Sequence, residues 1–231
     1  ALSNVPSIRY SGDRAIRRRT GKQAELERPL VPRGALEQGR VFAWPALFRQ
    51  VLAHGAVALL LVSTVVYLHT RELAGLAGAA LYLAAAWAFF SGFALSHIIH
   101  EWGHFLGAAI SGSAFTIKPR VHPLFFDFVY VAIRAGQFLA LSSGGLLGNI
   151  ALFFALLFLN IPNSLVLTAL LAAVIGQLVY VLILELPVSL GVLAGKQPLD
   201  VLAAHFGQGK PLFIRATVGG VVAATLAFLL V

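Results

Sequence analysis

Long stretches without charge, separated by short polar segments, make up most of the chain after residue 49. A membrane helix needs about 20 consecutive apolar residues. The stretch 73–110 has one formally charged side chain, Glu101, and is too long for a single crossing of the hydrocarbon. It is expected to form either two spans broken near Ser91 and Gly92 or one long helix that projects from the membrane. Other membrane helices are predicted at 51–68, 138–159, 165–186 and 212–231.

The segments between these stretches contain helix breakers or strand-forming residues. Residues 1–49 have scattered Pro and Gly without an apolar period, so we predict an extended or partly helical arm. Residues 69–72 are predicted to form a polar turn, and residues 160–163 a tight turn between two spans. Residues 112–137 mix β-branched and aromatic residues with prolines, which is typical of a short β-hairpin at the membrane surface. A polar insertion at 187–211 precedes the last span.

The expected fold is therefore an all-α polytopic membrane protein of five to six membrane helices with a small β-hairpin. An even number of crossings between the arm and the hairpin would put Lys118, Arg120 and Arg134 on the arm's side, which favours five crossings. The predicted parts are a basic arm, a first span with its turn, a membrane core that includes the hairpin, and a terminal span, at 1–49, 50–72, 73–205 and 206–231.

Composition agrees with a membrane protein in contact with lipid. Only 11% of the 231 residues are charged, against about 25% in a soluble domain. The absence of cysteine excludes disulfides and thiolate metal ligands. Ten of the 17 Lys and Arg lie in residues 1–49 against four acids, which predicts a cytoplasmic arm able to touch anionic lipid. No motif supports nucleic-acid binding. Thirteen Arg against four Lys hint at a GC-rich bacterial genome, so we expect a bacterial inner membrane, with an organellar membrane as the alternative.

The candidate chemistry lies in the segment HEWGH at residues 100–104. On a helix, His100 and His104 lie on the same face and can share one metal ion, while Glu101 can act on water bound to that metal. This pattern is the HExxH signature of zinc hydrolases. An idle carboxylate is costly within a membrane segment, which favours a function for Glu101.

A catalytic zinc ion takes three protein ligands and leaves a fourth position open, so a third ligand must come from elsewhere in the chain. Ionisable residues near the predicted spans are few. The foremost candidates are Asp200, in the polar insertion, and Glu185, at the end of the predicted span 165–186. His54, His97 and His205 are weaker candidates.

Three features in this order resemble the site-2 proteases, a family of intramembrane zinc metalloproteases. The HExxH motif lies within a membrane helix, and a hairpin-like segment follows it. Gly145 and Asn149 then stand in a run of small residues that is similar to the start of the family's next core helix. The third feature is the Pro198-Leu199-Asp200 element, which follows a further span. The resemblance covers about residues 74–205.

The resemblance implies a zinc site and a peptidase mechanism. His100, His104 and Asp200 would hold Zn²⁺, and Glu101 would carry the proton from water to the leaving amine. Gly145 and Asn149 would contact the substrate or support the oxyanion. Pro187 and Asp200 are thirteen residues apart, farther than in the family's element, so Glu185 remains an alternative ligand.

The implied function is cleavage of a transmembrane segment of a membrane-protein substrate. The segment would be locally unwound, because helical carbonyls are hydrogen-bonded and shielded, and the hairpin would hold it by strand addition. The alternative is a catalytically silent, protease-like membrane subunit or assembly partner of a larger membrane complex. The expected partners are therefore membrane lipids, a transmembrane substrate and possible subunits of such a complex.

Overall fold

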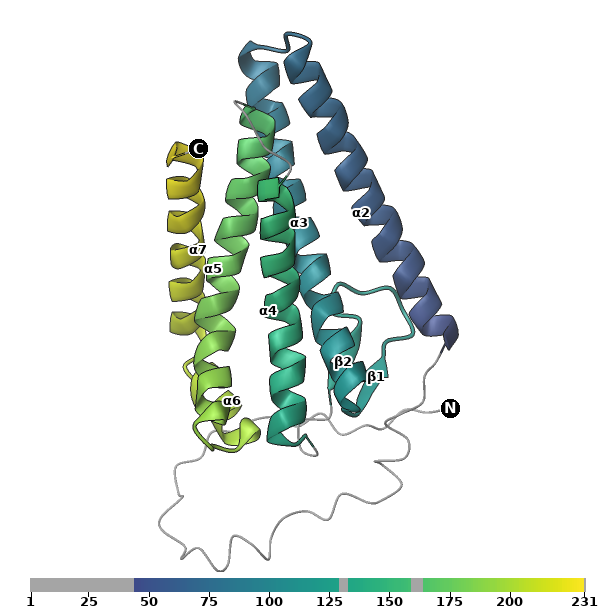
Figure 1. The fold of residues 1–231 in the computed structure, drawn as a ribbon, viewed down its shortest axis with the longest axis vertical. Coiled ribbons are helices and arrows are strands. Elements are labelled where there is room, and N and C mark those ends of the chain that lie inside the picture. The colour runs from purple at the N-terminus through teal and green to yellow at the C-terminus, as the bar shows by residue number, and fades with distance from the viewer. Residues whose placement is uncertain (1–43, 129–132, 159–163, 231) are drawn as a thin grey trace, which may run out of the picture. The chain divides into compact units, whose positions relative to one another are not determined.

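The computed structural model describes residues 44–128, 133–158 and 164–230, all within one compact unit, residues 33–231. In these ranges five helices are long and apolar enough to cross a membrane. They are α2 (Trp44–Leu73), α3 (Gly78–Ser111), α4 (Ala135–Phe158), α5 (Leu165–Leu193) and α7 (Lys210–Leu230), with a short α6 (Pro198–Phe206) between the last two (Figure 1). The predicted all-α polytopic fold with a small hairpin is confirmed.

The long stretch that contains Glu101 forms one helix from Gly78 onward, α3, without a break at Ser91 and Gly92. Its 34 residues extend about 51 Å, well beyond the ~30 Å hydrocarbon core. Both small residues are buried against neighbouring chain rather than exposed at a turn. A Cβ on Gly92 would lie 2.6 Å from the Leu170 carbonyl oxygen, so this glycine allows α5 to pack closely on α3.

The hairpin consists of β1 (Phe115–Ile117) and β2 (Phe126–Phe128), which pair antiparallel. Phe115 and Ile117 are buried while Thr116 between them is exposed, the alternation expected of a strand with one packed face. Gln50 of α2 is fully buried and its Nε2 donates to the carbonyl oxygens of Lys118 (3.1 Å) and Arg120 (2.7 Å). Helix α2 thus holds the loop that joins the two strands.

Helix boundaries differ from the prediction, most of all at three places. α5 continues through Pro187 to Leu193, so the predicted end at residue 186 is wrong. A proline inside a helix removes one hydrogen bond, and packing against neighbouring helices can offset that loss in a membrane protein. The predicted arm ends earlier, because α2 begins at Trp44, and the predicted turn at 69–72 is helical. Residues 1–43 and the predicted turn at 160–163 lie outside the described residues.

Small residues bring the membrane helices close together. A Cβ added to Gly103 or Gly107 of α3 would collide with the backbone of α4 at Gly144 or Ala140. Without a hydrophobic driving force between helices in lipid, such close backbone contact is a main source of helix association. This contact holds α4 directly against the HEWGH segment of α3.

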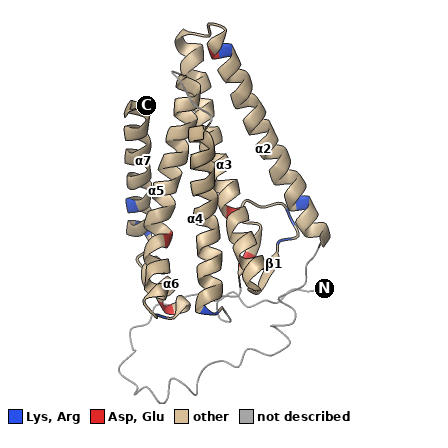
Figure 2. Ribbon diagram, viewed as in Figure 1, with Lys and Arg blue, Asp and Glu red and all other residues tan. Residues whose placement is uncertain are grey.

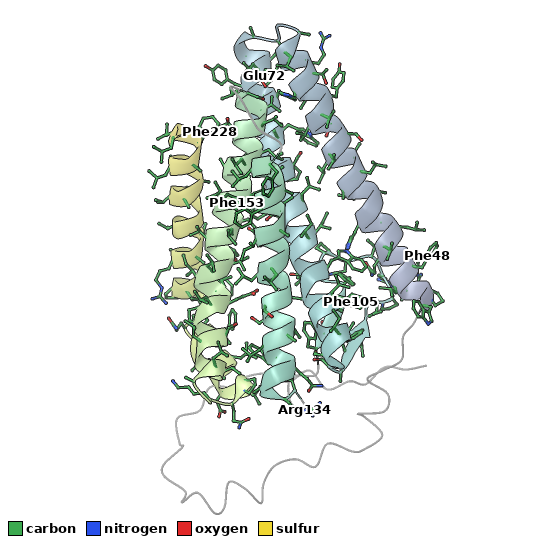
Figure 3. The ribbon with its side chains drawn as sticks, in the orientation of Figure 1. Phe48, Glu72, Phe105, Arg134, Phe153 and Phe228 are labelled. Carbon is green, nitrogen blue, oxygen red and sulfur yellow. The ribbon has the colours of Figure 1, made fainter. Side chains whose placement is uncertain are left out.

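A carboxylate joins the end of α2 to the start of α5, at the end of the bundle opposite the hairpin (Figure 3). Glu72 accepts hydrogen bonds from the backbone N–H of Leu165 (2.7 Å) and Val166 (3.3 Å) and from the Ser164 hydroxyl (2.5 Å). The first N–H groups of a helix lack partners within the helix and carry partial positive charge. Glu72 therefore acts as a cap supplied by another helix.

We expect Glu72→Ala to lower the free energy of unfolding by about 1–2 kcal/mol, because the first N–H groups of α5 lose their acceptor. The measurement is the denaturation midpoint in detergent micelles. Arg71→Ala is the matched control, since Arg71 is the exposed neighbour of Glu72 and its loss should cost less than about 0.5 kcal/mol. Equal effects of the two substitutions would contradict the capping role.

Candidate metal centre

Three side chains from two distant parts of the chain converge inside the bundle. His100 Nε2 lies 2.9 Å from His104 Nε2, and Glu185 Oε1 lies 2.9 Å from the first and 3.1 Å from the second. The histidines come from α3, four residues apart, and Glu185 comes from α5. All three are buried or half-buried. Two imidazole nitrogens and one carboxylate oxygen therefore meet at one point.

The size of this triangle fits a tetrahedral zinc ion. Ligand atoms at about 2.0–2.1 Å from zinc in a tetrahedron lie about 3.3 Å from one another, close to the three separations here. The donor set of two histidines and one glutamate is one that catalytic zinc sites use. Glu185 Oε2 is also buried without a hydrogen-bond partner among the described residues. A bound cation would satisfy this carboxylate, so the residues fit zinc.

Hydrogen bonds behind the imidazoles set their orientation. His104 Nδ1 lies 2.8 Å from the Leu141 carbonyl oxygen of α4, so Nδ1 is the protonated nitrogen and donates. Nε2 faces the meeting point, and in the neutral ring its lone pair would be free for a metal, as in a metal-ligating histidine. The Asn149 amide lies 3.5 Å from His100 Nδ1 and its Oδ1 accepts from the Ser96 hydroxyl at 3.2 Å.

Gly145 provides the space that both imidazoles occupy. A Cβ at this position would lie 2.6 Å from His104 Cε1 and 2.7 Å from His100 Cε1. Any side chain here would displace the rings, because such distances are shorter than van der Waals contact. The structure thus places Gly145 and the fully buried Asn149 directly against the histidines. Their predicted contact with substrate or an oxyanion stays a prediction.

A cavity of about 350 Å³ lies beside the three converging side chains. Glu101, His104 and Glu185 line it together with β2 and the loop before it, and α4, α5 and α6 supply the rest of its wall. Its lining is mainly apolar, with one ion pair between Lys118 Nζ and Asp127 Oδ1 at 3.3 Å. Glu101 of the HExxH motif therefore faces the same space as two of the three possible metal ligands, His104 and Glu185.

Asp200 lies away from this group. It is exposed in the first turn of α6, two residues after Pro198, and the cluster of possible ligands does not include it. Of the two foremost candidates for a third ligand, the structure brings Glu185 to the histidines and not Asp200. His54 accepts a hydrogen bond from Trp102 Nε1 at 3.1 Å, which occupies one of its ring nitrogens.

The supporting contacts could not be recognised in the sequence. The Leu141 carbonyl carries no side-chain signal, and Ser96 resembles any small residue of a membrane helix. Ser189 lies one helical turn after Glu185 and its hydroxyl is 2.8 Å from that of Ser142, which joins α5 to α4 beside the site. Only the packing of the helices reveals these roles.

Comparisons with protein families, with characterised proteins and with solved structures found no match to this chain. The chemistry of the site is therefore inferred from its own residues.

We expect the purified full chain to retain about one zinc ion, because two histidines and a glutamate complete a three-ligand site. Glu185→Ala should lose most of this zinc, whereas Asp200→Ala should retain it. Elemental analysis of the detergent-solubilised protein measures the ratio. Circular dichroism and size-exclusion profiles of each variant confirm that it is folded. Zinc that is lost with Asp200→Ala and kept with Glu185→Ala would overturn the assignment of the third ligand.

Proposed function

We propose that this protein is an intramembrane zinc metallopeptidase, similar to the site-2 proteases, which cleaves a transmembrane segment of another membrane protein. The observation that carries the proposal is the meeting of His100, His104 and Glu185 beside Glu101 at a cavity between apolar helices. A zinc hydrolase requires a set of metal ligands and, beside it, a carboxylate that can act as general base.

Each residue has a role that follows from its place. His100, His104 and Glu185 would hold zinc, which when bound lowers the pKa of water and polarises a carbonyl group. Glu101 lines the cavity and its carboxylate accepts the proton of the attacking water. The same oxygen then delivers that proton to the amide nitrogen of the scissile bond, so that water and peptide give a carboxylic acid and an amine. Leu141 and Asn149 keep the imidazoles oriented.

The shape of the cavity supports an extended substrate. Phe126, Asp127 and Phe128 of β2 line it, so a segment lying there would run beside a strand. A helical segment hides its carbonyl groups in hydrogen bonds, and addition of an unwound segment to the sheet would present them to the site. The apolar lining supports a substrate drawn from a membrane helix rather than from a polar loop.

The distribution of basic residues supports an orientation with the hairpin side in the cytoplasm. The start of α2, the hairpin, the start of α4 and the segment between α5 and α7 all lie at one end of the bundle, as Figure 2 shows. Arg71 lies at the opposite end. We propose a bacterial inner membrane with the basic arm in the cytoplasm, following the positive-inside rule. Among the described residues, the basic ones at the hairpin end are Arg49, Lys118, Arg120, Arg134, Lys196, Lys210 and Arg215.

The test uses the full chain in lipid vesicles together with single-span reporter proteins whose membrane helices contain Gly, Asn or Pro. We expect cleavage within a reporter's membrane segment, detected as new termini by mass spectrometry. Glu101→Gln should lower the rate by about 100-fold or more, because it removes the proton acceptor, while zinc content stays unchanged.

Glu72→Gln is the matched control, since it makes the same chemical change at the capping site away from the cavity. It should leave the rate of cleavage near that of the wild type. Cleavage that persists in Glu101→Gln would contradict the mechanism. A zinc-loaded wild type that cuts no reporter would contradict the peptidase and favour the catalytically silent subunit.

A further inference from the structure

A second cavity, of about 310 Å³, lies between α3, α5 and α7. Phe89 and Phe93 of α3 form one side, and Thr217 and Val221 of α7 the other. These four side chains are exposed, so the cavity is an open groove on the outside of the bundle. It shares no lining residue with the cavity at the histidines. We call it the α3–α7 groove.

Gln177 lies in this groove and is 4% exposed. Its Oε1 is buried and accepts no hydrogen bond from any residue that the structure describes. Buried amides are almost always hydrogen-bonded, and polar side chains within membrane segments are costly unless they have a partner or a function. A lone buried amide in a groove therefore indicates that something else supplies the partner.

Two further polar side chains share the groove with Gln177. Tyr180 follows it by three residues on α5, and Thr217 stands across from them on α7. No hydrogen bond joins either side chain to another described residue. The floor is narrow, because a Cβ on Gly176 would lie 2.8 Å from the Gly220 carbonyl oxygen. Gly176 and Gly220 therefore let α5 and α7 pack closely together at the floor of the groove.

The depth of Gln177 limits what can occupy the groove. It lies twelve residues after the start of α5 and sixteen before its end, near the middle of a membrane helix. Acyl chains occupy this depth and cannot form hydrogen bonds, and lipid headgroups remain at the surface. The group that reaches Gln177 from outside the bundle at this depth is a polar side chain on another membrane helix.

We propose that the α3–α7 groove binds a transmembrane helix of a separate partner protein, which places an amide or hydroxyl side chain against Gln177. The partner's backbone would lie over the opening between Phe93 and Val221 with one or two side chains inserted, and the Gln177 amide would turn outward to meet them, since its Oε1 is buried in the free chain. Interhelical hydrogen bonds of this kind, combined with small residues at the contact, are a common basis of recognition in membranes. The proposal does not depend on peptidase activity, since the groove is separate from the metal site.

The absence of cysteine allows a direct test, because an introduced cysteine is unique. Val221→Cys, labelled with a photo-crosslinker, reports a helix in the groove, and Val62→Cys on exposed α2 reports chance encounters in the bilayer. The probes are two Leu/Ala-rich peptides of about 20 residues, identical except for a central Asn or Leu. Full chain and peptide are mixed in phosphatidylcholine vesicles, and the crosslinked yield is measured against peptide concentration.

We expect the Asn peptide to bind about threefold or more tightly than the Leu peptide at Val221→Cys, and no such preference at Val62→Cys. Gln177→Leu, which keeps the volume and removes the amide, should abolish the preference. Thr168→Val should preserve it, because Thr168 is a buried polar residue of the same helix outside the groove. Thermal unfolding of both variants, followed by circular dichroism, checks that they are folded.

Three outcomes would overturn the proposal. Equal binding of the two peptides would mean that lipid chains or water occupy the groove. A preference that survives Gln177→Leu would place the recognition elsewhere. Crosslinking between two copies of the chain, dependent on Gln177, would assign the groove to self-association instead of a separate partner.

Discussion

A carboxylate within a membrane bundle is stable only with partners that offset its loss of water, and Glu185 meets this constraint through His100 and His104. The contact joins α5 to α3 across a separation of more than eighty residues in the sequence. The contact also places Glu185 in the wall of the cavity that Glu101 lines, so two carboxylates face the same space. A cation at the meeting point would satisfy both the imidazole lone pairs and the unpartnered Glu185 Oε2.

Close helix contacts make this meeting possible. Gly103 and Gly107 let α4 approach α3, and Gly145 leaves room for both imidazoles. α5 continues as a helix through Pro187, so Glu185 is held on a packed element two turns before its end rather than on a loop. Sites on packed helices hold their ligands more precisely than sites on loops, which agrees with the tight triangle of donor atoms.

Much of this architecture is local in the sequence and could be predicted from it. The histidines of the HEWGH segment share a helix face by spacing alone, and the strands around Phe115 and Phe126 follow from residue type. The acid that meets the two histidines could not be predicted, because no local pattern indicates which distant carboxylate reaches α3. Pro187 misled the prediction for the same reason: proline ends most helices, and only packing against other helices shows that α5 continues. Gln177 looked like part of an apolar span, and its lack of a partner is visible only in three dimensions.

Zinc K-edge X-ray absorption of the zinc-loaded full chain identifies the donor atoms around the metal. We expect one zinc ion with two imidazole nitrogens and carboxylate or water oxygens at about 2.0–2.1 Å, and no sulfur. The same triangle of atoms would also arise if a protonated imidazole bound Glu185 by hydrogen bonds alone. A folded chain that takes up no zinc, or holds it through fewer than two imidazoles, would support that second arrangement and contradict the metal centre.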